Sequence, residues 1–251
     1  MTYLVYLLAG IFLPLFPLSM LLNILYARMR HPLLRSLLLL IWPQIGLAVI
    51  FAFHLDVPDW IKLWSLLTAL LYALRSLTLR ELGLWTSFVG TSAWVLLWVL
   101  FDNSTNTLQL QLFALGISVP LMMMALLGAG LEQRFGAAYL GLYSGLAHSI
   151  PRFTGVLVMV VLAVVATPLF PTFFAMLAMI MKTIPVTPML AMGVGVVWLL
   201  WSWSGARLLQ GLIVGPHSHA VVDLSQTNLW VSIAVLAGLV FVGAYCLGAL
   251  L

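Results

Sequence analysis

The feature that most constrains this chain is a series of apolar runs, each about 20 residues long, separated by short polar breaks. Hydrophobic residues make up 64% of the 251 residues and charged residues only 6%, whereas a soluble domain carries about 25% charged residues. A soluble protein this apolar could not cover its surface with polar groups, so its solvent must be lipid. We therefore predict an all-α integral membrane protein that forms a single transmembrane domain over residues 1–251.

Eight runs are long enough to cross a bilayer. They lie at 3–25, 33–54, 60–79, 82–101, 108–131, 152–180, 187–210 and 228–250. Arg75, Arg80 and Glu81 mark the break between the third run and the fourth. The first run has no preceding positive segment and no small-residue cleavage site after it, so we expect a retained span and not a signal peptide.

The basic residues indicate how the spans are oriented. Eight arginines fall beside alternate loops, whereas Lys62 and Lys182 fall on the opposite side. These arginines are Arg28, Arg30, Arg35, Arg75, Arg80, Arg134, Arg152 and Arg207. By the positive-inside rule the arginine-bearing loops face the cytoplasm, which places both termini on the non-cytoplasmic side of an inner membrane. The formal charge of +4 is spread over these loops, so no nucleic-acid partner is expected.

Prolines indicate where spans are interrupted. The first and sixth runs both contain Pro-Leu-Phe-Pro, at Pro14–Pro17 and Pro168–Pro171, and the second run contains Pro43. Proline removes a backbone donor and clashes with the preceding turn, so we predict that prolines interrupt all three spans, the sixth by a break or a kink. Such helices either line an ion pathway or only improve packing. The prolines alone favour packing, because proline is common in membrane helices.

Two further features concern the ends of the spans. The longest loop is 132–151, in which we expect a short surface helix followed by a turn. Several tryptophans near span ends suggest an interfacial aromatic belt: Trp60, Trp64, Trp201, Trp203 and Trp230.

Residues that carry chemistry are scarce. The acidic residues lie in loops or at span ends, and Arg75 is the one charge with a potentially buried position, although snorkelling to the interface is favoured. The histidines, including the pair His217 and His219, lie at span ends or in loops without a ligand cluster, and Cys246 is the single cysteine. We predict no catalytic residues, no metal and no cofactor. The polar side chains within spans, Asn23, Gln44, Thr86, Ser87 and Ser118, are interpreted as hydrogen-bonding groups between helices.

Several segments in order along the chain resemble the second half of the antiporter-like membrane subunits of respiratory complex I, Mrp-type antiporters and related hydrogenase and inorganic-carbon-uptake complexes. They are the Phe12–Leu18 stretch, the turn Leu79–Ser87, the helix 113–131 with Gly116, the run from Gly145 through Pro168 to Phe173, and the end from Leu208 through Leu224. Those subunits usually have about fourteen helices, so the resemblance implies a truncated chain that begins at a broken helix.

The chain departs from the family at four positions of the proton path. By this register the family's lysine before the first proline pair is Phe12, the lysine of the next helix falls at Pro43, the histidine before Gly116 is Leu115, and the charged residue of the broken twelfth helix is Met176. The family's proton-pumping role therefore does not carry over. The resemblance implies a non-catalytic, non-conducting accessory subunit in lipid, beside a full-length antiporter-like subunit and a soluble catalytic subunit.

Two alternatives remain open from the sequence. The first is a self-contained transporter or channel for a neutral solute or for partner-assisted proton conduction. The second is an intramembrane enzyme, which lacks a catalytic pair or metal cluster to support it. For the accessory role, Ala234 and Gly238 are the candidate helix-packing face, and the segments 28–35 and 132–151 are candidate docking surfaces.

Overall fold

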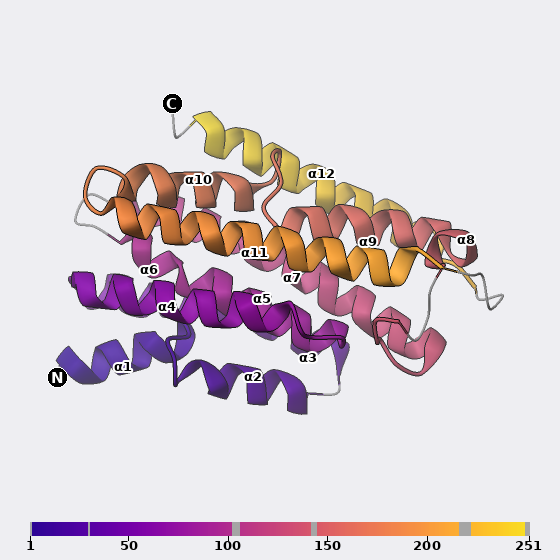
Figure 1. The fold of residues 1–251 in the computed structure, drawn as a ribbon, viewed down its shortest axis with the longest axis horizontal. Helices are drawn as coiled ribbons and strands as arrows, with labels where there is room; N and C mark the ends of the chain where they lie inside the picture. The colour runs from indigo at the N-terminus through magenta and orange to yellow at the C-terminus, as the bar shows by residue number, and fades with distance from the viewer. Residues whose placement is uncertain (1, 30, 102–105, 142–144, 216–221, 249–251) are drawn as a thin grey trace.

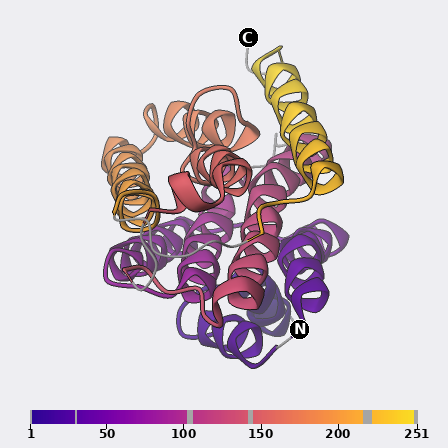
Figure 2. The same cartoon turned by 90° about the vertical axis from the view of Figure 1, so that its right-hand side faces the viewer.

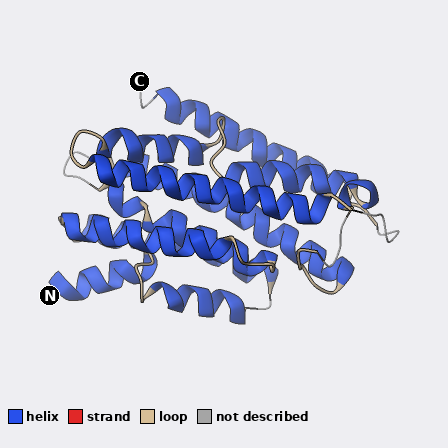
Figure 3. Cartoon of the chain, viewed as in Figure 1, coloured by secondary structure: helices blue, strands red, loops and turns tan. Residues whose placement is uncertain are grey.

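The computed structural model describes residues 2–29, 31–101, 106–141, 145–215 and 222–248, and within them all regular structure is helical (Figure 3). The prediction of an all-α fold is confirmed. The helices are α1 (Thr2–Phe12), α2 (Ser19–Arg28), α3 (Pro32–Ala52), α4 (Asp59–Ser76), α5 (Leu82–Val95), α6 (Leu97–Leu100), α7 (Thr107–Phe135), α8 (Leu146–Ser149), α9 (Pro151–Val164), α10 (Pro171–Thr183), α11 (Pro188–Ile213) and α12 (Gln226–Gly248).

These helices pair with the eight predicted spans. Five segments are long and apolar enough to cross a membrane: α3, α5 with α6, α7, α11 and α12. Helix α4 supplies an 18-residue rod, and the pairs α1–α2 and α9–α10 each form an interrupted one. The rods lie along one long axis in Figure 1, and α9 continues into α10 across the break. The predicted break between the third and fourth spans is confirmed, because α4 ends at Ser76 and α5 begins at Leu82.

The central rods are α5–α6 and α7. Within the described chain, 83% of the α5–α6 span and 72% of the α7 span are buried, against 22% of the α12 span. The view down the bundle in Figure 2 agrees, since α12 stands at the edge, beside α9, α10 and α7. Apolar side chains exposed on the outer helices are ordinary for a protein whose solvent is lipid.

The charged residues separate to two ends of the bundle. Arg207 on α11 donates to the Leu77 carbonyl after α4, and Arg134 on α7 donates to the Val222 carbonyl before α12. We call the end of the bundle that holds these two contacts the arginine end. Its described arginines are Arg28, Arg35, Arg75, Arg80, Arg134, Arg152 and Arg207. The opposite end, the lysine end, carries Lys62 in the first turn of α4 and Lys182 in the last turn of α10. Arg30 lies outside the described residues.

Three local expectations were wrong. The second span is not interrupted, because α3 continues through Pro43; a lone proline removes one helical hydrogen bond, which packed membrane helices tolerate. The segment 132–151 is not wholly a loop, since α7 continues to Phe135 and the left-handed Gly136 ends it. Trp201 is not interfacial, because it lies 1% exposed in the protein core.

Candidate functional site

The first helix break lies between α1 and α2, at residues 13–18, and contains Pro14 and Pro17. A break frees backbone carbonyl oxygens that the next turn of a helix would otherwise bond, and in lipid each must find another donor. Three tryptophan indoles supply these donors from three other rods. Trp42 of α3 donates to the Ile11 oxygen over 3.0 Å, Trp98 of α6 to the Leu13 oxygen over 3.0 Å, and Trp64 of α4 to the Phe16 oxygen over 2.8 Å.

The second break lies between α9 and α10, at residues 165–170, with Pro168 inside it and Pro171 opening α10. The indole of Trp198 on α11 donates to the carbonyl oxygens of Val165 and Ala166, at 3.2 and 3.1 Å. The Thr172 hydroxyl donates to the Ala163 oxygen over 2.5 Å. These bonds satisfy carbonyls that a water-filled pathway would otherwise hydrate.

Close packing also seals the second break. A Cβ atom added at Gly243 of α12 would lie 2.3 Å from the carbonyl oxygen of Leu169, so only glycine lets the two backbones approach this closely. On the other side, a Cβ atom added at Gly116 of α7 would lie 2.4 Å from the Cβ of Pro171. The break is therefore pressed between α7 and α12.

The four proton-path positions named from the sequence lie in different surroundings. Phe12 packs against the ring of Trp42 with centroids 4.9 Å apart, and Pro43 is buried within α3. Met176 is buried on α10, whereas Leu115 is exposed on the surface of α7. The structure thus places Phe12 beside α3 at the first break and Met176 in the core near the second.

Apart from the Tyr26 hydroxyl and the Trp85 indole N–H, the buried polar side-chain atoms of the described residues have a hydrogen-bond partner. Asn23 of α2 donates to the Ser19 carbonyl over 2.9 Å and accepts from the Ser87 hydroxyl of α5. The indole of Trp94 donates to the Ser118 hydroxyl over 3.1 Å, which joins α5 to α7. Within the described chain, serine and threonine side chains are buried together with Tyr26 and Tyr72, and no acidic, basic or histidine side chain is buried. Serine and threonine hydroxyls do not titrate near neutral pH and commonly form hydrogen bonds between membrane helices.

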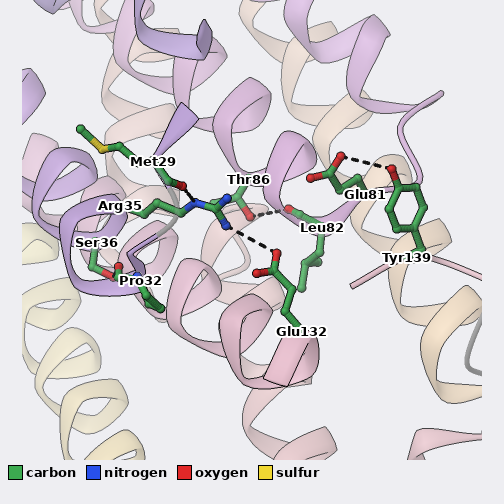
Figure 4. Close-up of polar contacts among 9 residues, drawn as sticks. All are labelled: Met29, Pro32, Arg35, Ser36, Glu81, Leu82, Thr86, Glu132 and Tyr139. Carbon is green, nitrogen blue, oxygen red and sulfur yellow. Dashed lines mark hydrogen bonds and ion pairs between the residues drawn. The ribbon is translucent and has the colours of Figure 1, made fainter. Parts of the chain in front are cut away.

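Charged side chains meet at the arginine end (Figure 4). Arg35 of α3 donates to the Met29 carbonyl over 2.6 Å, lies 3.5 Å from the Glu132 carboxylate of α7, and stands over the Tyr26 ring at 5.4 Å. In the same view the Tyr139 hydroxyl points to the Glu81 carboxylate, 3.5 Å away. The Arg35–Met29 hydrogen bond ties the α2–α3 connection to α3, and the Tyr139–Glu81 contact ties the segment after α7 to the start of α5.

Asp223 fixes the start of the second broken helix. Its carboxylate accepts from the backbone N–H groups of Arg152 and Phe153, at 2.9 and 3.1 Å, and so caps the N-terminus of α9. Burial alone would raise the pKa of this carboxyl, but the N–H groups of Arg152, Leu224 and Phe153, with the Arg152 charge, hold the pKa below its ordinary value.

The remaining candidates carry no reactive cluster in the part of the chain that the structure describes. Arg75 is exposed in the last turn of α4 and stands over the Phe88 ring at 5.8 Å. No group of three or more metal-ligating side chains occurs among the described residues. The His217–His219 pair lies outside them.

Sequence reasoning missed the tryptophans that cap the breaks. Trp98 and Trp198 were not singled out, and Trp64 was assigned to an interfacial belt, although its indole bonds the first break. The available signal was the number of tryptophans within apolar runs, because a buried indole N–H needs an acceptor. Which carbonyl each indole reaches depends on how the rods pack, and no pattern along the chain carries that information.

Comparison with known proteins places this geometry in a fold class. No protein-family model and no curated protein matches the chain. Among solved structures, a chain of respiratory complex I from Thermus thermophilus with bound NADH superposes with a TM-score of 0.84 at 19% identity, covering 94% of this chain and 53% of that one. A chain of the Mrp complex from Dietzia sp. DQ12-45-1b gives 0.75 at 20% identity, with 86% and 42% covered.

A third neighbour is the membrane-bound sulfane sulfur reductase, an archaeal respiratory membrane complex, with a TM-score of 0.81 at 15% identity over 94% of this chain and 51% of that one. The chain therefore has the fold of membrane subunits in these complexes. It spans about half the length of the chains it matches.

Proposed function

We propose that this chain is a non-catalytic accessory subunit of an ion-coupled membrane complex and that it does not itself conduct protons. The observation that carries the proposal is the closure of both helix breaks by tryptophan. Five carbonyl oxygens at the breaks accept indole N–H groups, and no acidic, basic or histidine side chain is buried among the described residues. Proton transfer across a membrane needs a chain of titratable groups, for which this interior offers no support.

The fold supports membership of a larger assembly. The solved neighbours are chains of multisubunit complexes. We infer that the partners are a full-length antiporter-like membrane subunit and a soluble catalytic subunit, in a host related to complex I, to Mrp antiporters or to inorganic-carbon uptake. The outer face of α12, where Ala234 and Gly238 are exposed, is the inferred contact for the membrane partner. The segments 28–35 and 132–151 are the inferred contacts for the soluble one.

We further infer an orientation in which the arginine end faces the cytoplasm of an inner membrane and both termini lie on the other side. The separation of seven described arginines from two lysines at opposite ends of the bundle supports this orientation. Cysteine labelling with a membrane-impermeant maleimide tests it in cells. Asp59→Cys at the lysine end reacts from outside the cytoplasm, and Arg80→Cys at the arginine end reacts only after permeabilisation; the reverse pattern would overturn the orientation.

The accessory role is tested by purifying the tagged chain in gentle detergent at native expression and identifying what accompanies it by mass spectrometry. We expect stoichiometric recovery of an antiporter-like chain together with a soluble subunit. Gly238→Leu places a large side chain on the outer face of α12 and is expected to release the membrane partner. Gly195→Leu on α11 is the matched control, since a Cβ atom at either glycine meets nothing within 4 Å.

Proton conduction is tested separately. The chain reconstituted in liposomes with a pH-sensitive dye inside is expected to leave the proton leak of the vesicles unchanged under an imposed membrane potential. A folded, monodisperse chain that is recovered alone, and that increases the leak, would contradict the accessory role and favour a self-contained transporter.

A further inference from the structure

A cavity of about 330 Å³ opens at the arginine end, away from the two breaks. Its lining comes from three parts of the chain that are far apart in sequence. They are the end of α4 with the α4–α5 connection and the first turn of α5, the segment after α7, and the last turns of α11. The polar side chains of the lining come from the first and third parts: Ser76, Arg80, Trp85, Ser204 and Arg207.

Backbone pairing holds this wall in place. The Leu140 N–H donates to the Arg80 carbonyl over 2.7 Å, and the Leu82 N–H donates to the Ala138 carbonyl over 3.0 Å. The two segments thus form a short antiparallel bridge. Across the cavity, the Arg207 guanidinium donates to the Leu77 carbonyl, which ties α11 to the end of α4. The position of both arginines is therefore set by tertiary contacts and not by their neighbours in sequence.

The charge of the cavity is positive. Neither Arg80 nor Arg207 forms an ion pair with a carboxylate of the described residues, where Arg35 and Lys62 supply the ion pairs that are formed. Glu81 follows Arg80 in the chain, but its carboxylate faces the Tyr139 hydroxyl and does not line the cavity. Two guanidinium groups, each with a planar fork of donors, are left without an anion.

Trp85 adds an unusual donor to the same wall. It is 1% exposed, and its indole N–H is buried with no hydrogen-bond partner among the described residues. The other large buried tryptophans, Trp94, Trp98 and Trp201, all donate to an oxygen. A buried donor without an acceptor is rare in native proteins. The Tyr26 hydroxyl is the other buried polar group without a partner among the described residues, and it does not line this cavity.

We propose that this cavity binds the phosphate of an anionic phospholipid headgroup. Arginine forks match the oxygens of a phosphate, and basic pockets between membrane helices at the interface bind acidic headgroups. The leucines at positions 77, 79, 140 and 208 complete the lining and supply an apolar surface for the glycerol and upper acyl carbons. A free phosphate ion shares the chemistry of the headgroup but does not use this apolar surface.

The test measures retention of phosphatidylglycerol by the full chain in phosphatidylcholine nanodiscs, by native mass spectrometry and lipid titration. The wild-type chain is expected to hold one phosphatidylglycerol. The double variant Arg80→Gln/Arg207→Gln is expected to bind it about 25-fold more weakly, about fivefold for each arginine. The double variant Arg28→Gln/Arg75→Gln removes the same charge from exposed residues of the same end that do not line the cavity, and is expected to bind within about twofold of wild type.

Trp85→Phe tests whether the indole N–H contributes to phosphatidylglycerol binding or is a buried donor without a ligand. Phenylalanine keeps an aromatic ring but removes the N–H, so we expect severalfold weaker phosphatidylglycerol binding with no loss of thermal stability in lipid-free detergent. Equal affinity in the wild type and the cavity double variant would overturn the proposal. Release of the bound lipid by excess inorganic phosphate would also overturn it, by assigning the cavity to a free anion.

Discussion

The two Pro-Leu-Phe-Pro segments share four residues but differ in structure. At Pro14–Pro17 the second proline precedes the helix, and α2 begins only at Ser19. At Pro168–Pro171 Leu169 has a φ of 98°, and Pro171 itself opens α10. The same tetrapeptide therefore selects where a helix breaks, while its surroundings select the conformation of the break.

The two breaks also differ in how their carbonyls are satisfied. The first receives one indole from each of three rods. The second receives one indole that two carbonyls share, and its Leu169 carbonyl packs against Gly243. We call the first closure distributed, because its indole donors come from three rods, and the second concentrated, because one indole serves two carbonyls. Substitutions are therefore expected to affect the second break more strongly, and this difference can be measured.

The largest expected effect is that of Met176→Ala on α10. Met176 is 2% exposed, so its truncation leaves a cavity beside the second break and is expected to cost about 2–5 kcal/mol. Leu115→Ala on α7 is the control, because Leu115 is 37% exposed and its truncation is expected to cost much less. Reversible denaturation in mixed micelles measures both, and a proton-flux assay in liposomes is expected to stay at baseline. A Leu115→Ala variant as unstable as Met176→Ala would contradict the surface position of Leu115 and the buried position of Met176.

Gly243→Ala tests the concentrated closure directly. The new Cβ would lie 2.3 Å from the Leu169 oxygen, so α12 or the break must shift, at a cost of about 1–3 kcal/mol. Gly238→Ala on the same helix meets nothing within 4 Å and is expected to be neutral or slightly stabilising. Thermal unfolding of the two variants side by side decides the point, and equal midpoints would count against close packing at the second break.

Removing single indole donors compares the two closures. Trp198→Phe removes one indole donor that two carbonyls share, and Trp98→Phe removes one that serves a single carbonyl; the loss of one such buried donor costs about 1–3 kcal/mol. We expect a larger loss of unfolding free energy for Trp198→Phe. Trp203→Phe on α11 is the control, because that ring is 64% exposed and no hydrogen bond of its indole is seen. A larger loss for Trp98→Phe would mean that the first break is the concentrated one.

The smallest expected effect is that of Asp223→Asn at the start of α9. The pKa of Asp223 is lowered in the folded state, so its ionised form stabilises the fold above the ordinary carboxyl pKa, and this contribution disappears as the pH falls through the lowered value. Because the group is largely hydrated, we expect at most about 1 kcal/mol at pH 7. Unfolding midpoints of wild type and Asp223→Asn are expected to differ at pH 7 and to converge below the lowered pKa. A difference that persists in acid would indicate that the carboxylate charge is not what caps α9.

Much of the architecture follows from the sequence because the bilayer imposes simple rules. Runs of about 20 apolar residues give the rods, and the arginines identify one end. The paired prolines predict the two real breaks, since two prolines three residues apart remove two donors from one turn. Pro43 shows the limit of that rule, because one missing hydrogen bond leaves α3 continuous.

The lack of charge at the expected proton-path positions could also be read from the sequence, but the hydrogen bonds that close the two helix breaks could not. That Phe12, Leu115 and Met176 are apolar is visible in the sequence, whereas their surroundings are not. Leu115 turned out to lie on the outer surface and Met176 in the core. Only helix packing decides such a difference, because both residues lie within equally apolar runs.

What the sequence by itself determined is therefore the all-helical membrane fold, the positions of its spans and breaks, and the lack of charge within them. These features depend on local backbone chemistry and on the energy of moving each residue into lipid. The tertiary structure alone decided which indole reaches which carbonyl, and that Arg80, Trp85 and Arg207 share one cavity. The physical reason is that hydrogen bonds join residues up to 130 positions apart, and the geometry of these bonds and of the cavity exists only once the rods have packed.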